Sequence, residues 1–170
     1  MWPTPASAQQ PMLGAARWRV VSAGKVVTQA GKRGSRSNPV PVRVLIVDDH
    51  ALARAGMRKL LSGARQLEIV GEAADARDAI NLCRRLRPDL VLMDVRLPDM
   101  DGLAATRAIR QALPEIRVLL VTMYEAREYA SEAVRAGAAG YLLKGASRRE
   151  VLAALRRALT GPSTPPIEPG

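Results

Sequence analysis

The sequence predicts an α/β fold in which a parallel sheet is covered by helices on both faces. Two observations carry this prediction. Between residues 42 and 160, short apolar runs alternate with longer segments whose apolar residues recur every three or four positions. The short runs suit buried strands and the longer segments suit amphipathic helices. Their regular alternation, five times over, predicts a doubly wound parallel sheet with right-handed crossovers.

The first strand and helix are expected at residues 42–47 and 51–62. The strand is β-branched and apolar, and it runs directly into Asp48, Asp49 and His50. The helix should turn one apolar face toward the core, formed by Leu52, Ala55, Leu60 and Leu61. Its outward positions are Arg54, Arg58 and Lys59.

The second unit contains a half-exposed strand. Residues 67–73 alternate only partly between apolar and polar, which suits the edge of a sheet. Residues 76–86 form the next amphipathic helix, which Pro88 ends. Cys83, the single cysteine, lies on the apolar stripe of this helix, so we expect a buried structural thiol. A lone cysteine excludes an internal disulfide and suits a reducing compartment.

The third unit holds the most uniformly apolar strand, residues 90–94, which ends on Asp94. A short run of this kind, with prolines on either side, predicts a strand buried on both faces at the centre of the sheet. The helix that follows is expected at residues 103–113.

The last two units repeat the pattern, with strand 116–122, helix 125–136, strand 140–144 and a helix after Ser147. The two strands end on Thr122 and Lys144. Ser147 and Glu150 have the spacing of a capping box, in which each side chain accepts a hydrogen bond from the other residue's backbone. The apolar face of the last helix is formed by Val151, Leu152, Leu155 and Leu159.

The two ends of the chain lack such periodicity. We expect a basic, disordered extension over residues 1–41, the folded domain over 42–160 and a flexible tail over 161–170. Of the net charge of +10, six positive charges lie in the extension, which has no acidic residue, so the charge is not by itself a nucleic-acid footprint. No apolar run has the length of a membrane span or forms a secretory signal, and a cytoplasmic protein is expected.

Polar residues at the strand ends form the candidate site. Parallel strands point the same way, so their last residues converge at one edge of the sheet; these are Asp48, Asp49, Asp94, Thr122 and Lys144. Three clustered carboxylates repel one another unless a cation neutralises them, and Mg²⁺ prefers oxygen ligands beside phosphates. We therefore expect Asp94 to attack phosphorus and form an aspartyl-phosphate, stabilised by Mg²⁺ and Lys144.

In this order, the motifs resemble the receiver domain of bacterial two-component response regulators. The match covers residues 42–160 and rests on Asp48-Asp49, Asp94, the Leu-Pro-Asp-Met-Asp-Gly run at 97–102, Thr122 and the run 140–144. The resemblance implies a flavodoxin-like sheet of strand order 2-1-3-4-5 with five helices, in three layers. Receivers of LuxR/FixJ-type regulators are the most similar, judged by the run 47–50 with Leu52, Arg54 and Gly56, and by the run 136–144.

The resemblance also implies a role for each site residue. Asp94 would accept a phosphoryl group from a sensor histidine kinase or a phosphotransfer protein. The implied Mg²⁺ ligands are Asp48, Asp49, Asp94 and the main-chain carbonyl of Arg96. Thr122 would hydrogen-bond the phosphoryl group, Lys144 would pair with it, and Tyr141 would turn inward as the coupled switch. The surface so switched would comprise the fourth helix, the fifth strand and the fifth helix, and a homodimer could form on phosphorylation.

The sequence departs from the family pattern in two places. Gly145 stands where many receivers have proline, so a cis peptide bond is not expected there. LuxR-type regulators normally continue into a helix-turn-helix domain, for which residues 161–170 are too few. The expectation is a signalling domain, not an enzyme, which does not bind DNA directly and which controls transcription through a partner or a missing domain.

Two alternative functions stay open: a pseudo-receiver that acts as an interaction module without phosphorylation, and a truncated LuxR-type DNA-binding regulator. A phosphatase with an aspartate nucleophile is disfavoured, because such enzymes usually carry a second Asp where Arg96 stands. His50 begins a helix and is not expected to bind metal or act in catalysis. A basic surface on the last helix is expected to be solvated, and it comprises Arg148, Arg149, Arg156 and Arg157.

Overall fold

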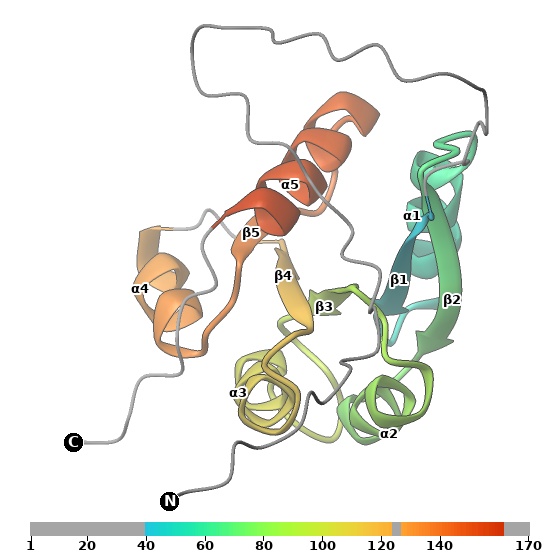
Figure 1. Ribbon diagram of the computed structural model, residues 1–170. Helices are drawn as coiled ribbons and strands as arrows, with labels where there is room; N and C mark the ends of the chain where they lie inside the picture. Colours follow the sequence, from blue (N-terminus) through green and yellow to red (C-terminus); the bar gives the residue numbers. More distant parts are fainter. Residues whose placement is uncertain (1–39, 124–126, 162–170) are drawn as a thin grey trace, which may run out of the picture. The chain divides into compact units, whose positions relative to one another are not determined.

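Five strands form one parallel sheet in the order β2-β1-β3-β4-β5, as predicted. The computed structural model describes residues 40–123 and 127–161 (Figure 1). The strands are β1 (Val42–Val47), β2 (Leu67–Ala73), β3 (Leu90–Asp94), β4 (Arg117–Thr122) and β5 (Gly140–Leu143). The helices are α1 (Ala51–Leu61), α2 (Ala76–Leu86), α3 (Gly102–Ala112), α4 (Arg127–Arg135) and α5 (Arg148–Thr160).

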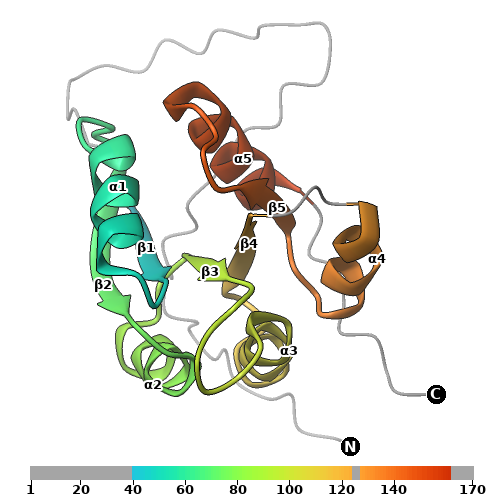
Figure 2. The ribbon, with the colours of Figure 1, turned by 180° about the vertical axis from the view of Figure 1, so that it is seen from behind.

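Helices cover the sheet on both faces, which gives the predicted three layers. Figure 1 shows α1 and α5 above the sheet and α2 and α3 below it, and Figure 2 shows the same layers from behind. Successive residues of a strand point to opposite faces. One face contributes Leu45, Val47, Val91, Met93, Val118 and Leu120 to the core beneath α2 and α3. The other contributes Val44, Ile46, Leu90, Leu92, Leu119 and Val121 to the core beneath α1 and α5.

The burial of the strands follows their position in the sheet. All five residues of β3 are buried, which confirms the prediction of a central strand. In β2, at the edge, six of seven residues are at least partly exposed, as its alternating sequence predicts. Asp94 is therefore the last residue of the strand that lies deepest in the molecule.

Among the helices whose starts are described, three begin on a side chain that accepts a hydrogen bond from the first turn. Asp75 caps α2 and Asp101 caps α3. Ser147 and Glu150 form the predicted capping box at the start of α5. Caps of this kind satisfy backbone N–H groups that have no partner within the helix, and they fix where each helix begins.

Helix α1 differs from the prediction in the face that it buries. Leu52, expected on the apolar face, is 85% exposed. Arg54, expected to point outward, instead lies against Glu72 of β2, with Nε 3.1 Å from a carboxylate oxygen. Leu52 lies in the first turn of α1, which begins at Ala51, four residues after β1 ends at Val47. Leu61 is buried in the core and Leu60 packs against it, as predicted, together with Met57. Ala53 and Gly56 line the cavity between α1 and the sheet.

Other element ends shift by a residue or two. Strand β4 begins at Arg117 rather than at 116, α3 spans Gly102–Ala112 rather than 103–113, and β5 ends before Lys144. Helix α4 was expected over 125–136 and is described from Arg127 to Arg135. Hydrogen bonding frays at the ends of elements, where such differences are normal.

The predicted flanks fall largely outside the described residues, namely at 1–39 and 162–170, so the extension and the tail stay predictions. Within the described part of the chain, no helix has the length and apolar composition needed to cross a membrane. The peptide bonds described there include no cis form, and Gly145 adopts a φ of +94°, which only glycine takes up easily.

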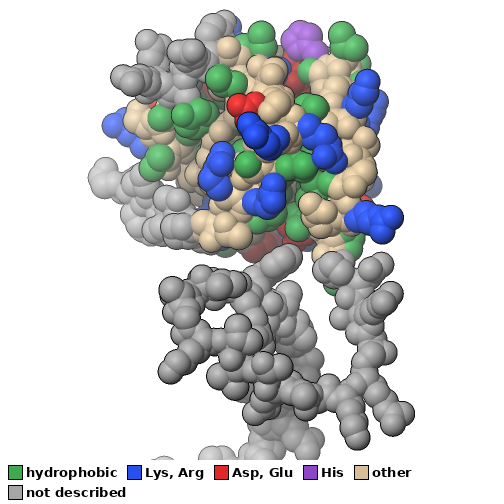
Figure 3. Space-filling model, turned by 90° about the horizontal axis from the view of Figure 1, so that it is seen from above, with side chains coloured by type: hydrophobic (Ala, Val, Ile, Leu, Met, Phe, Trp, Pro, Cys, Tyr) green, Lys and Arg blue, Asp and Glu red, His purple; other side chains and the backbone are tan. Residues whose placement is uncertain are grey.

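The side of the molecule formed by α1 and α5 is basic. Figure 3 shows Lys and Arg side chains spread over this side, among apolar groups. The four arginines of α5 singled out in the sequence, at 148, 149, 156 and 157, are all exposed. Their exposure agrees with a solvated face and identifies no partner.

Candidate functional site

The carboxyl edge of the sheet brings together the strand-end residues that the sequence predicts. A cavity of about 160 Å³ opens at this edge and is lined by Asp49, His50, Asp94, Val95, Arg96, Thr122, Met123 and Lys144. These residues come from four different strand ends. Parallel strands with right-handed crossovers leave such a crevice beyond their carboxyl ends.

Asp94 is the innermost carboxylate of this site, with 4% of its surface exposed. One of its oxygens, Oδ2, accepts a hydrogen bond from Nζ of Lys144 at 2.8 Å. The other, Oδ1, accepts a longer one from the backbone N–H of Arg96 at 3.3 Å. Burial raises the pKa of Asp94, and the charge of Asp48 adds to this, while Lys144 and the Arg96 N–H act against it.

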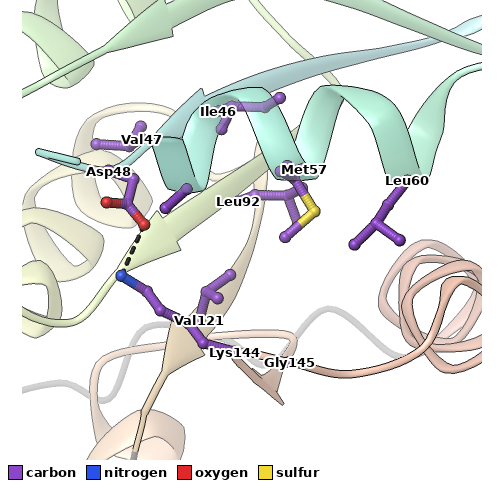
Figure 4. A pocket seen from close by; sticks show the side chains of 11 residues that line it. Ile46, Val47, Asp48, Met57, Leu60, Leu92, Val121, Lys144 and Gly145 are labelled. Carbon is purple, nitrogen blue, oxygen red and sulfur yellow. Dashed lines mark ion pairs between the residues drawn. The ribbon is translucent and has the colours of Figure 1, made fainter. Parts of the chain in front are cut away.

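Lys144 joins the two strands that carry the buried carboxylates. Its ammonium nitrogen lies 2.7 Å from Asp48 and 2.8 Å from Asp94. Figure 4 shows the contact with Asp48, at one end of an apolar cavity between α1 and the sheet. Burial alone would lower the pKa of Lys144, but hydrogen bonds and charge from Asp48 and Asp94 together raise it. The lysine therefore stays positively charged.

The acidic pair after β1 completes a compact set of oxygen donors. Asp48 is nearly buried, whereas the side chain of Asp49 is one-third exposed, at 33%. Ligand atoms from Asp48, Asp49, His50 and Asp94 all lie within 4.8 Å of one another. Three carboxylates at this spacing suit a small divalent cation that keeps several waters, as Mg²⁺ does. The donor set therefore fits Mg²⁺.

His50 lies closer to this site than its position at a helix start suggests. Its Nδ1 is 2.7 Å from Asp49 Oδ1 and 3.5 Å from Asp48 Oδ1. The imidazole is largely exposed, with 72% of the side chain accessible. The sequence gives His50 no role, and the geometry makes it a neighbour of the carboxylates rather than a buried ligand.

The remaining predicted residues take different positions. Thr122 is buried at the end of β4 and lines the cavity with Asp94. Arg96 lines it too, on the loop after β3, and its backbone N–H already contacts Asp94. Tyr141, on β5, is 45% exposed, so its side chain lies on the surface and not in the cavity.

The loop after Asp94 contains residues that support the site and whose roles the sequence did not predict. A Cβ added to Gly102 would lie 2.0 Å from the main-chain oxygen of Asp94, so only glycine fits there. Asp99 accepts hydrogen bonds from the backbone N–H groups of Ala76 and Arg77, which ties this loop to the start of α2. The Leu-Pro-Asp-Met-Asp-Gly run carried the signal, but its spacing alone does not show what each residue contacts.

Cys83 is fully buried on α2, as predicted. Burial raises the pKa of its thiol to about 12, so it carries no thiolate near neutral pH. It lies in the core beneath α2 and α3 and takes no part in the site.

Comparison with known proteins identifies the family of this chain. A family model of the response regulator receiver domain matches residues 44–156. The response regulator GacA of Pseudomonas aeruginosa is 42% identical over 120 residues, which cover 71% of this chain and 56% of GacA. UvrY of Escherichia coli is 40% identical over 120 residues, covering 71% of this chain and 55% of UvrY. The chain thus spans about half the length of the curated relatives it matches.

Solved structures of receiver domains resemble this chain as well. The signal receiver domain of NarL from Mycobacterium tuberculosis superposes with a TM-score of 0.69 at 37% identity, over 73% of this chain and all of that one. A LuxR-family response regulator from Aurantimonas gives a TM-score of 0.68 at 39% identity, over 72% of this chain and 88% of its own.

Proposed function

Because this chain belongs to the family of response regulator receiver domains, we propose that Asp94 is its phosphorylation site and that phosphorylation switches an output. The observation that carries the proposal is the set of contacts around Asp94. A buried carboxylate at a strand end lies 2.8 Å from a lysine ammonium and within 4.8 Å of further carboxylate donors. Such an arrangement serves phosphoryl transfer, which needs a placed nucleophile and positive charge around the moving group.

In the proposed reaction, a carboxylate oxygen of Asp94 attacks the phosphorus of a phosphohistidine. The P–N bond breaks, and the histidine of the kinase or phosphotransfer protein leaves with the bonding electron pair and takes up a proton. The Asp94 carboxylate becomes an acyl phosphate. Lys144, already 2.8 Å from Asp94, is placed to pair with the added negative charge.

The ligands proposed for Mg²⁺ are Asp48, Asp49, Asp94 and the main-chain carbonyl of Arg96. When bound, the cation neutralises charge on the transferring group and orients its oxygens. Without it, three carboxylates would repel an incoming phosphoryl group, with Lys144 as the cation in direct contact with Asp48 and Asp94.

The switch is proposed to run from Thr122 to Tyr141. Thr122 lines the same cavity as Asp94, and its hydroxyl would hydrogen-bond the phosphoryl group after moving toward it. Tyr141, exposed on neighbouring β5, would then turn inward and change the α4-β5-α5 surface. This surface would bind an output partner or a second copy of the chain. Three further points stay predictions: control of transcription through a partner or a further domain, action in the cytoplasm, and the lack of enzymatic turnover.

The test is phosphorylation by acetyl phosphate in the presence of Mg²⁺, followed by intact-protein mass spectrometry. We expect one added phosphoryl group that is stable in acid and released by hydroxylamine, as acyl phosphates are. It should be absent from Asp94→Asn and present in Asp75→Asn, a matched control in which asparagine still caps α2. A wild-type chain that takes up no such group would favour a phosphorylation-independent interaction module instead.

A further inference from the structure

Arg54 is an arginine of α1 that the proposed phosphoryl transfer leaves without a role. Its Nη1 donates a hydrogen bond to the main-chain oxygen of Asp48 at 2.6 Å. Its Nε pairs with Glu72 of β2 at 3.1 Å. The side chain is largely buried, with 19% exposed. One guanidinium therefore joins the acidic pair, the first helix and the edge strand.

We propose that Arg54 is a positioning residue for the cation site: it fixes the backbone from which Asp48 and Asp49 present their carboxylates. The inference rests on the proposed function, since it concerns how that site is held. Arg54 itself does not touch the cation or the phosphoryl group.

Asp48 is held by a hydrogen bond at each of its polar groups. Its backbone N–H donates to Ala73 of β2 at 3.1 Å, and its main-chain oxygen accepts from Arg54. Its carboxylate accepts from the backbone of His50 at 2.9 Å and from Lys144 at 2.7 Å. Among these contacts, the hydrogen bond from Arg54 fixes the orientation of the peptide plane between Asp48 and Asp49. The orientation of this plane sets the direction of the backbone at Asp49.

Helix α1 has no side-chain cap of the kind found at α2, α3 and α5. Its N-cap residue is His50, whose side chain makes no capping hydrogen bond. The helix also carries no acidic residue in its first turn. A guanidinium only donates hydrogen bonds, so Arg54 does not cap the free N–H groups of α1. It instead ties the helix to the main-chain oxygen of Asp48, which lies before the helix start.

The guanidinium of Arg54 contacts Glu72 and the Asp48 carbonyl through different nitrogens. Arginine presents its N–H donors in a rigid, planar guanidinium. A carboxylate that binds one edge of this group therefore also orients its remaining N–H groups. Glu72 is the register partner of Ile46 in β1, two residues before Asp48. Arg54 therefore links the backbone of Asp48 to Glu72 of β2. A lysine, with its single ammonium, does not reproduce both contacts.

Arg58 provides a matched control from the same helix. It also pairs with Glu72, through Nη1 and the other carboxylate oxygen, but makes no described contact with Asp48. Arg58→Met and Arg54→Met thus remove the same number of positive charges and one contact each with Glu72. Only Arg54→Met removes the hydrogen bond to the Asp48 carbonyl.

The experiment measures Mg²⁺ binding alone, without phosphodonor, by isothermal titration calorimetry on the full chain. Groups that orient metal ligands typically change metal affinity by about 10 to 100-fold when removed. We expect Arg54→Met to raise the Kd for Mg²⁺ by about tenfold, whereas Arg58→Met changes it by less than about twofold. Arg54→Lys, which keeps the charge, should resemble Arg54→Met, because the fork is lost.

Equal Kd values for wild type and Arg54→Met, or equal losses in Arg54→Met and Arg58→Met, would overturn the inference. If Arg54→Met does not fold by circular dichroism, Arg54→Lys decides by the same criterion. Acetyl phosphate labelling of the same preparations separates the two proposals. Suppose that the wild type binds Mg²⁺ and is labelled at Asp94, and that Arg54→Met binds Mg²⁺ with the same Kd. The positioning role is then contradicted, while the proposed function stands. A wild type that does neither contradicts the proposed function, and the positioning role with it.

Discussion

At the scale of single residues, the site balances two buried carboxylates against one ammonium. Asp94 and Asp48 are both nearly buried and share Lys144. Burial raises the pKa of Asp94 above the ordinary value of 3.8, despite the lysine. The ionised carboxylate is therefore held at a cost in folding free energy, which a bound cation or a covalent reaction can relieve.

This cost predicts a pH-dependent gain in stability for Asp94→Asn. The folded state binds the Asp94 proton more tightly than the unfolded state, so ionisation destabilises the fold above the folded-state pKa and has no effect below 3.8. In EDTA at pH 7, we expect Asp94→Asn to be more stable than wild type. The difference should shrink as the pH falls through the folded-state pKa. Urea denaturation at several pH values measures it, and a gap that widens toward acid pH would contradict this account.

At the scale of elements, the position of Asp94 depends on how closely α3 approaches the end of β3. The backbone N–H of Gly102 donates to the Val95 oxygen at 2.8 Å, which brings the start of α3 onto the strand end. Asp101 caps the same helix, and Asp99 ties the loop to α2. The loop that follows the candidate phosphorylation site is thus fastened to two helices.

Gly102→Ala is therefore expected to disturb both stability and phosphorylation. The three atoms nearest to the new methyl group would be main-chain atoms of Asp94 and Val95, at 2.0 to 2.9 Å, and these cannot give way without moving the strand end. We expect a loss of about 1–3 kcal/mol in the free energy of unfolding and slower labelling by acetyl phosphate.

Gly56→Ala is the control for this change. Gly56 lies within α1, and a Cβ there meets no atom within 4 Å. Because alanine favours helix over glycine, this variant should gain about 1 kcal/mol. Equal effects of the two substitutions on urea denaturation would show that the close approach at Gly102 does not matter.

At the scale of the whole molecule, the chain has the fold of a receiver and about half the length of the curated relatives it matches. The described residues place the carboxyl edge of the sheet, with its donor atoms, at the surface where a cation can enter. A ligand that binds only the folded state stabilises all of it, because unfolding must first release the ligand.

Mg²⁺ is therefore expected to stabilise the whole domain. At a hundredfold excess over its Kd, the gain in unfolding free energy is about 2.7 kcal/mol. Thermal melts followed by circular dichroism should show a Tm that rises with Mg²⁺ and returns on addition of EDTA. Asp49→Asn should respond less, because it removes one of the carboxylates that could hold the ion. A Tm that does not depend on Mg²⁺ would contradict the proposed cation site.

The sequence by itself determined the parts of this protein that depend on periodicity and order along the chain. Apolar runs and helical stripes fixed the strands, the helices and the buried centre at β3, because each pattern buries one face or both. Since parallel strands end at one edge, the same patterns placed Asp48, Asp94, Thr122 and Lys144 together.

Only the tertiary structure decided the contacts between elements far apart in the chain. The sequence could not show that Lys144 bridges Asp48 and Asp94, that Arg54 turns inward to Glu72, that Leu52 is exposed, or that Gly102 lies against the Asp94 carbonyl. Periodicity predicts which face of an element is apolar, but in α1 it put Leu52 and Arg54 on the wrong faces. The partner that a side chain meets depends on the distance and angle between packed elements, which are set by the whole core at once.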